Sequence, residues 1–165
     1  HDTLALLATG GGKSICYQVP GLAREGLTLV ITPLISLMQD QVKTLQNKNI
    51  RAQAIYSGLS FKHIDILLDN AIYGGIDFLF VSPERLQTRL FIERFKKMNI
   101  GLIAVDEAHC ISEWGHDFRP SYLEIEKIRV HHPSAPIIAL TATATQKVVE
   151  DICVHLQLKL SLIHI

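Results

Sequence analysis

Short apolar runs alternate along the chain with longer stretches in which apolar residues recur every three or four positions. Most of the short runs are apolar at consecutive positions, which is typical of parallel strands covered by helices on both faces. They predict six strands, at Thr3–Ala8, Leu27–Thr32, Ala52–Tyr56, Phe78–Ser82, Gly101–Asp106 and Ile137–Thr141.

Helical periodicity fills the segments between these runs. Glu84–Lys97 and Pro120–Val130 have apolar residues at helical spacing, and Pro120 suits the first turn of a helix. The repeated alternation of strand and helix predicts one α/β domain with a mostly parallel sheet flanked by helices. Ligands of such sheets bind in the loops that follow the strands. The clearest helical stripe consists of Leu34, Leu37, Met38, Val42 and Leu45.

Composition narrows the class of protein. The 165 residues are 48% hydrophobic, enough for a sizeable core, and 16 basic residues balance 16 acidic ones. The zero net charge excludes a broad basic surface for nucleic acid but allows a partner bound through a few local contacts. Three widely spaced cysteines argue against a disulfide framework or a zinc site and favour a reducing setting. No secretory leader or membrane-spanning run is visible, so we expect a cytoplasmic protein, nucleoid-associated if bacterial, with no membrane partner.

The loop after the first predicted strand is rich in glycine and precedes a helix. In Thr9-Gly10-Gly11-Gly12-Lys13-Ser14, backbone N–H groups can surround phosphate oxygens, and the helix N-terminus adds a favourable dipole. Lys13 would reach the β- and γ-phosphates of ATP, and the Ser14 hydroxyl would bind Mg²⁺. The strict phosphate-loop pattern has Gly where Leu7 stands, and such a loop can also be merely a turn.

Two carboxylates follow a second buried strand. Asp106 lies at the tip of this strand, where it would hold Mg²⁺ beside Ser14, because parallel strands end at one edge of the sheet. Glu107 would orient or deprotonate the attacking water, and His109 would sense the nucleotide or the neighbouring loop. Alternatively, the acids begin a solvated loop and His109 is a structural histidine. The two loops together indicate hydrolysis of a nucleoside triphosphate.

These motifs resemble those of superfamily 2 helicases, and the following residues narrow the resemblance. Cys110-Ile111-Ser112-Glu113-Trp114-Gly115-His116-Asp117-Phe118-Arg119-Pro120 closely resembles the aromatic-rich loop of RecQ-family DNA helicases. Three other segments, in the order found in that family, resemble its motifs Ia, Ib and III: 32–41, 81–86 and 139–145.

The resemblance implies that residues 1–165 form a RecA-like P-loop NTPase domain, the first ATP-binding lobe of an enzyme. That enzyme would couple ATP hydrolysis to 3′-to-5′ movement on DNA in repair and recombination, with ATP and Mg²⁺ as cofactors. Its adenine motif would lie upstream of this chain. A second RecA-like lobe with an arginine finger, and zinc-binding and winged-helix modules, would lie beyond it. The isolated chain would therefore be nearly inactive, with weak nucleotide binding at most.

The resemblance also implies roles for individual residues. Lys13 and Ser14 would bind phosphate and metal, and Ala8 stands where many family members carry Pro. The implied metal ligand is Asp106, and the implied activator of water is Glu107. The remaining implied residues contact DNA or couple it to the nucleotide: Ser36 and Arg85 on the DNA backbone, and Thr141 and Thr143 between the two sites.

The chemistry of the aromatic-rich loop supports a DNA contact. Trp114 and Phe118 offer ring faces for unstacked bases, and Arg119 can bind phosphate or stack. Because the loop follows the acids, DNA bound there would reposition Glu107 and His109, which predicts DNA-stimulated ATPase activity. Alternatively, the two rings pack into the core, as Phe commonly does.

Two other functions stay open at this point. One is a non-catalytic scaffold that binds nucleotide or DNA, against which the intact Lys13, Ser14, Asp106 and Glu107 argue. The other is a DEAH-type RNA helicase, against which the aromatic-rich loop argues. A small-molecule phosphotransferase is disfavoured because no segment forms a second substrate pocket.

Overall fold

The strands form one sheet in which every described pairing is parallel. A computed structural model describes residues 1–8 and 11–159. The strand order is β1-β6-β5-β2-β4-β3, so β6 separates the strand before the phosphate loop from the strand before the acids. The strands are β1 (Thr3–Leu6), β2 (Leu27–Ile31), β3 (Ala52–Ile55), β4 (Phe78–Val81), β5 (Ile100–Val105) and β6 (Ile137–Thr141).

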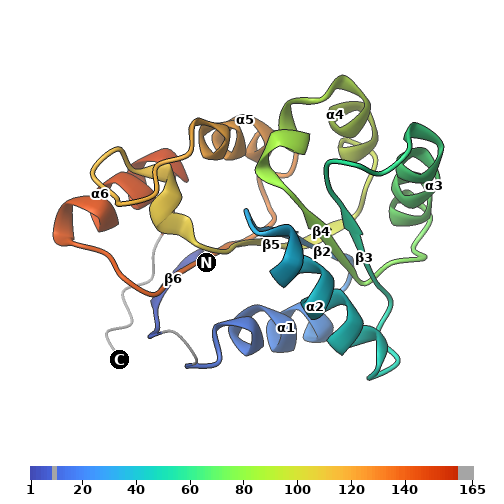
Figure 1. Cartoon of the computed structure of the whole chain (residues 1–165), viewed down its shortest axis with the longest axis horizontal. Coiled ribbons are helices and arrows are strands. Elements are labelled where there is room, and N and C mark those ends of the chain that lie inside the picture. Colours follow the sequence, from blue (N-terminus) through green and yellow to red (C-terminus); the bar gives the residue numbers. More distant parts are fainter. Residues whose placement is uncertain (9–10, 160–165) are drawn as a thin grey trace.

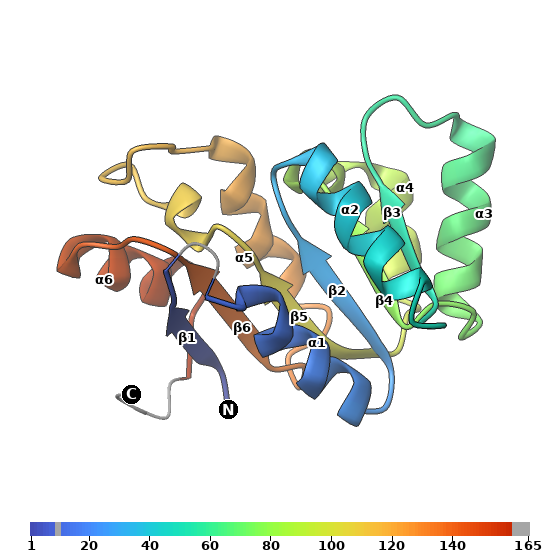
Figure 2. The ribbon, with the colours of Figure 1, turned by 60° about the horizontal axis from the view of Figure 1, so that its bottom comes forward.

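Helices cover both faces of this sheet, which confirms the predicted α/β class. Figures 1 and 2 show helices packed against each of the two faces. The first face carries α1 (Lys13–Ala23) and α2 (Ile35–Gln46). The second face carries α3 (Phe61–Ile72), α4 (Arg89–Phe95), α5 (Glu124–Arg129) and α6 (Gln146–His155).

Two hydrophobic cores result from the continuous apolar strands. Successive side chains of a strand point to opposite faces, so Leu29 and Ile31 join the core under α3 to α6 while Val30 joins the core under α1 and α2. The stripe predicted for α2 is only partly buried. Met38 and Leu45 are fully buried, whereas Leu34 precedes the helix and is exposed.

Several predicted boundaries are wrong by one or two residues or join separate elements. The first strand ends at Leu6 and the fifth at Val105. The single helix predicted over 84–97 is a 3₁₀ turn, Pro83–Gln87, followed by α4. Thr88 separates them because its extended backbone breaks the helix and its hydroxyl donates to the Arg85 carbonyl at 2.8 Å. The segment predicted over 120–130 is likewise a 3₁₀ turn, Pro120–Leu123, that continues into α5, and Pro120 does occupy the first turn.

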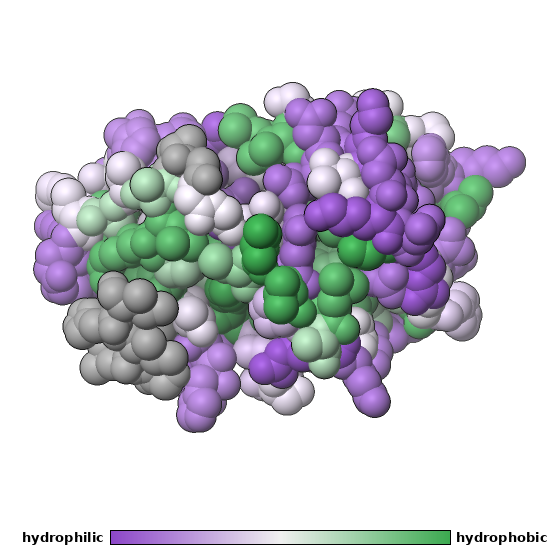
Figure 3. Space-filling view, turned by 90° about the horizontal axis from the view of Figure 1, so that it is seen from below, coloured by the Kyte–Doolittle hydropathy of each residue, from purple (hydrophilic) through white to green (hydrophobic). Residues whose placement is uncertain are grey.

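The surface includes one exposed apolar helix face. The outer face of α1 is apolar, with Ile15, Val19 and Leu22 more than half exposed, and this face belongs to the side seen in Figure 3. Among residues 1–8 and 11–159, no helix combines the length and apolar content needed to cross a membrane.

Candidate functional site

The phosphate loop turns sharply into α1. Thr9 and Gly10 lie outside the described residues, but Gly12 has the left-handed backbone (φ 78°) that favours glycine. The N–H of Gly11 donates to the Ala8 carbonyl at 2.9 Å, and a Cβ on Gly11 would approach that oxygen to 2.9 Å. The side chains of Lys13 and Ser14 therefore emerge from the first turn of the helix.

Leu7, at the position where the strict phosphate-loop pattern has Gly, lies before this turn. Its N–H donates to the Thr141 carbonyl at 3.0 Å, so the residue still runs along β6. A side chain is accommodated there because the chain has not yet begun to turn.

The phosphate loop and the acid loop meet through one ion pair. Lys13 Nζ lies 2.9 Å from Glu107 Oε1, and both side chains are about four-fifths buried. They approach across the end of β6, since β1 and β5 are not neighbours in the sheet. A phosphate group bound in the loop would therefore compete with the Glu107 carboxylate for the Lys13 ammonium.

Asp106 is the buried member of the acid pair. The side chain is 9% exposed, Oδ1 accepts the Glu107 N–H at 3.0 Å, and the Asp106 carbonyl accepts the Tyr122 hydroxyl at 2.8 Å. Burial, reinforced by the neighbouring Glu107 charge, raises the pKa of Asp106 above its ordinary value. A carboxylate and the Ser14 hydroxyl are hard oxygen ligands of the kind that Mg²⁺ prefers, so the residues present fit this ion.

Glu107 adopts an unusual backbone conformation. Its φ of 48° and ψ of 45° place a non-glycine residue in the left-handed region, at a cost of about 1–2 kcal/mol. This conformation directs the carboxylate between two partners, Lys13 and His109, whose Nδ1 lies 3.4 Å from Glu107 Oε2. Strain of this kind is typical of functional sites.

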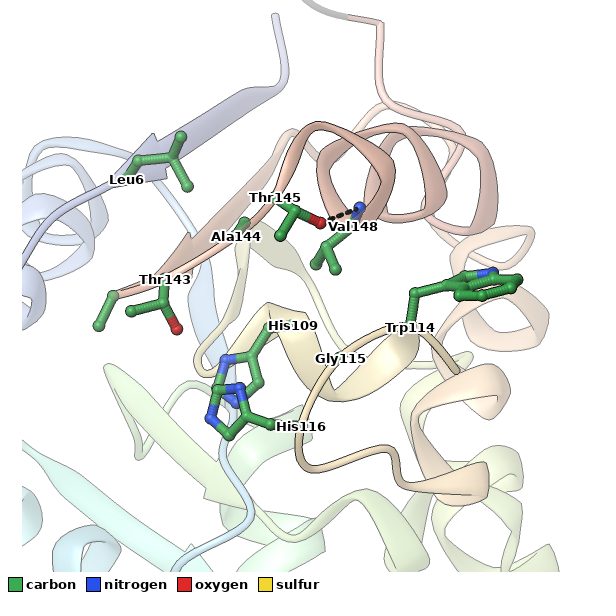
Figure 4. Close-up of a pocket in the computed structure, with 10 residues that line it drawn as sticks. Leu6, His109, Trp114, Gly115, His116, Thr143, Ala144, Thr145 and Val148 are labelled. Atoms are coloured by element: carbon green, nitrogen blue, oxygen red, sulfur yellow. Dashed lines mark hydrogen bonds between the residues drawn. The ribbon is translucent and has the colours of Figure 1, made fainter.

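His109 connects the acid loop to the segment after β6. Its Nδ1 lies 2.8 Å from Thr141 Oγ1, and the Thr141 hydroxyl donates to the Thr143 carbonyl at 3.1 Å. Because the single hydroxyl proton is used there, Thr141 accepts the Nδ1–H of His109. Burial lowers the pKa of His109, which keeps the ring neutral. Figure 4 shows this ring stacked on that of His116, and the two ring centroids lie 4.7 Å apart.

The aromatic-rich loop leaves its tryptophan exposed. Trp114 is 65% exposed, so the alternative in which it packs into the core is wrong, whereas Phe118 is half-buried. Arg119 pairs with Asp117 at 3.1 Å. A Cβ on Gly115 would lie 2.7 Å from the His109 carbonyl, so the loop can approach the acid segment this closely only with glycine.

His109, Cys110 and Asp117 bring three potential metal ligands within 4.8 Å of one another. Arg119 already engages the Asp117 oxygen that faces the thiol. Burial, together with the Asp117 charge, raises the pKa of Cys110 to about 12, so its thiol stays protonated. We interpret the cluster as a hydrogen-bond network that ties the loop to the 3₁₀ turn Ala108–Ile111.

The structure does not bring the two predicted DNA-backbone contacts into this network. Ser36 lies exposed in the first turn of α2, and the Arg85 guanidinium donates to the Tyr56 carbonyl at 3.0 Å. Sequence reasoning missed Ser112, which is fully buried and donates to Asp151 of α6 at 2.5 Å. No local pattern signals this pair, since 39 residues separate the partners.

A cavity of about 620 Å³ lies between the aromatic-rich loop and the segment after β6. Figure 4 shows its lining. His109 and His116 border it on one side and Thr143 on another. Leu6, the last residue of β1, also borders it, so the cavity lies beside His109 between the end of β1, the aromatic-rich loop and the segment after β6.

Comparisons with known proteins agree with this geometry. Residues 1–152 match the DEAD/DEAH box helicase family. The chain is 48% identical over 159 residues to the ATP-dependent DNA helicase RecQ of Haemophilus influenzae, covering 96% of this chain and 26% of that protein. It is 40% identical over 157 residues to the ATP-dependent DNA helicase Q1 of Rattus norvegicus, covering 91% and 25%. The chain thus spans about a quarter of the length of these relatives.

Solved structures share the fold. The Hef helicase domain of Pyrococcus furiosus superposes with a TM-score of 0.72 at 18% identity, covering 96% of this chain and 33% of that one. The DUF1998 helicase MrfA, solved with DNA and AMPPNP, superposes with a TM-score of 0.70 at 18% identity, covering 92% and 23%. At these identities the likeness shows the fold alone, and it confirms the expected RecA-like architecture.

Proposed function

The chain belongs to the DEAD/DEAH box helicase family, and from this premise we propose that it is the first ATP-binding lobe of a RecQ-type DNA helicase. The full-length enzyme would use ATP and Mg²⁺ to move 3′ to 5′ along DNA. Residues 1–165 would form this lobe, with a second RecA-like lobe as its partner. In a bacterium such an enzyme would work in the cytoplasm, at the nucleoid.

The observation that carries this proposal is the contact between Lys13 and Glu107 at 2.9 Å. It joins the phosphate-binding loop to the acid that would activate water, although 94 residues separate the two positions. A γ-phosphate would draw the Lys13 ammonium away from Glu107. The freed carboxylate would then accept a proton from the attacking water. Asp106 and Ser14 would hold Mg²⁺, which when bound neutralises charge on the phosphates.

A second set of contacts supports coupling to DNA. The Nδ1 atom of His109 lies near both Glu107 and Thr141, and the ring stacks on His116 of the aromatic-rich loop. A change in the loop would therefore reach the water-activating carboxylate through one side chain. This route favours a DNA-stimulated ATPase over a non-catalytic scaffold.

An isolated lobe would turn over very slowly. An arginine finger contributes about 10³–10⁵ in rate in phosphoryl-transfer enzymes, and we expect the second lobe to supply it. We therefore expect ATP turnover by the 165-residue chain to stay near background even with DNA present. Robust DNA-stimulated turnover or unwinding by this chain alone would contradict the two-lobe proposal.

The test of the function is Glu107→Gln in the full-length protein that carries this chain. We expect DNA-stimulated ATP turnover to fall by about 10²–10⁴ because the general base is lost, while binding of a fluorescent ATP analogue persists. Glu25→Gln, at an exposed position outside the site, is the matched control and should retain turnover. Full turnover by the Glu107 variant would remove that residue from the mechanism, and no turnover by the wild type would favour the scaffold.

The nucleic acid is tested by the same assay. Single-stranded DNA should stimulate turnover more strongly than RNA of the same length. The reverse result would favour the alternative of a DEAH-type RNA helicase.

A further inference from the structure

Helix α6 holds the aromatic-rich loop through two contacts. The Lys147 ammonium lies 3.3 Å from the centroid of the Trp114 ring, directly over its face. One turn further along α6, the Asp151 carboxylate accepts the buried Ser112 hydroxyl at 2.5 Å. Lys147 and Asp151 are four residues apart and so lie on the same side of the helix. Neither residue contributes to the nucleotide chemistry described above.

These contacts hold both the backbone and the indole ring of Trp114 in place. The backbone N–H of Trp114 donates to Ser112 Oγ at 3.2 Å, so the hydroxyl that binds Asp151 also anchors the tryptophan backbone. Figure 4 shows the indole alongside α6 and apart from the stacked His109 and His116 rings. An otherwise exposed tryptophan is thus held in one position before any ligand arrives.

One face of the indole stays available. Trp114 is 65% exposed although Lys147 lies over its ring, and an indole covered on both faces would not expose two-thirds of its surface. Nucleobases stack on exposed aromatic faces of this kind. A platform whose side chain is already ordered binds more tightly, because less rotamer freedom is lost on binding.

We infer that Lys147 is a positioning residue that holds Trp114 as a preformed platform for an unstacked base of single-stranded DNA. The inference rests on the proposed DNA-binding function and adds a residue that the motifs did not indicate. In this arrangement Lys147 acts through the indole and does not itself need to contact a DNA phosphate. The competing role for Lys147 is a direct contact with a DNA phosphate, and the experiment has to distinguish that role from positioning of Trp114.

Fluorescence tests the platform without DNA, because Trp114 is the only tryptophan of the chain. In Lys147→Met the side chain keeps its length but loses its charge. We expect the emission of Trp114 to change and its quenching by acrylamide to increase, while Lys147→Arg, which retains a cation over the ring, behaves like the wild type. Lys127→Met, at an exposed lysine of α5 paired with Glu124, is the matched control. Unchanged emission and quenching in Lys147→Met would overturn the inference.

DNA binding tests the consequence. In the full-length protein, Lys147→Met should weaken binding of a fluorescein-labelled oligothymidylate about two- to fivefold, the factor expected for an exposed cation–π contact. The slope of log affinity against log salt should stay unchanged, and the effect should vanish in a Trp114→Leu background.

Each other outcome has a defined meaning. If the loss persists with Trp114→Leu and the salt slope falls by about 0.7, Lys147 contacts a phosphate and the positioning role is wrong. Equal affinity in Lys147→Met and wild type would also refute it, while DNA binding itself would stand. If the wild type binds no DNA, the proposed DNA contact fails and the platform fails with it.

Discussion

Replacement of Asp2 by Asn should destabilise the lobe strongly although it changes only one atom. The Asp2 side chain is buried, and its Oδ1 accepts the Ile137 N–H at 2.8 Å. Its Oδ2 accepts the Lys159 N–H at 2.7 Å and the Arg129 guanidinium at 2.6 Å. Whichever way the asparagine amide turns, its NH₂ group faces an N–H donor. In either orientation the Arg129 charge, nine-tenths buried, loses the carboxylate that neutralises it and keeps its hydrogen bond to the Leu156 carbonyl.

The magnitude follows from these contacts. Loss of one partner of a buried ion pair costs about 3–5 kcal/mol, and we expect about 3 kcal/mol because Arg129 retains the Leu156 carbonyl. For a chain of this length, each kcal/mol lowers the melting temperature by about 2–4 °C. The expected loss is therefore about 6–12 °C, measured by circular dichroism at neutral pH. Asp40→Asn, at an exposed position of α2, is the control and should melt like the wild type.

The pH dependence gives an independent test. Burial alone would raise the pKa of Asp2, but the Arg129 guanidinium and the N–H donors of Lys159 and Ile137 outweigh it and lower that pKa. The resulting stabilisation is present above the unfolded-state pKa near 4 and is lost as the pH falls through the lower, folded-state pKa. The difference between wild type and Asp2→Asn should therefore shrink below about pH 4. A variant that melts within about 2 °C of the wild type at neutral pH would refute the reasoning.

Three further substitutions test the site itself. Asp106→Asn should raise the melting temperature at pH 7 by a few degrees while abolishing ATP turnover of the full-length protein, because a buried carboxylate beside Glu107 disfavours folding when ionised. Since the pKa of Asp106 is raised, this gain should shrink as the pH falls and the wild-type carboxyl protonates, and a lower melting temperature at pH 7 would contradict it. Thr141→Val should cost about 1–2 kcal/mol in urea unfolding, because His109 Nδ1–H loses its acceptor, and NMR titration should show a higher His109 pKa as the ring turns to the Glu107 carboxylate. Unchanged stability and an unchanged His109 pKa would rule this out. Gly115→Ala should cost about 1–3 kcal/mol in the same unfolding assay, because the new Cβ would lie 2.7 Å from the His109 carbonyl, and a neutral substitution would show that the loop can move away.

The apolar pattern was sufficient for the strands and for the class of fold. Successive residues such as Leu29 and Val30 point to opposite faces of the sheet, so an apolar run makes its strand apolar on both faces. Such strands need helices on both sides of the sheet, which is typical of parallel pairing, and the runs do pair in parallel. It could not place helix boundaries, since Thr88 interrupts an otherwise periodic segment through a hydrogen bond of its own side chain. Periodicity reports which side of an element is apolar, not where a polar side chain caps it.

The residue types of the nucleotide site were also readable from the chain. Glycine before Lys13 and carboxylates after an apolar strand have chemical meanings that do not depend on the rest of the fold. The left-handed backbone of Glu107 was not readable, because nothing local favours that conformation in a glutamate.

What the linear order could not provide is the set of partners. Four contacts between residues distant in sequence depend on the strand order, which inserts β6 between β1 and β5. They are Lys13 with Glu107, His109 with Thr141, Asp2 with Arg129, and Lys147 with Trp114. Local patterns arise from the period of a helix or a strand, which the backbone imposes on neighbouring residues. Contacts between distant residues depend on how the whole sheet is wound, and there the fold, not the chain order, decides which charge and which ring each side chain meets.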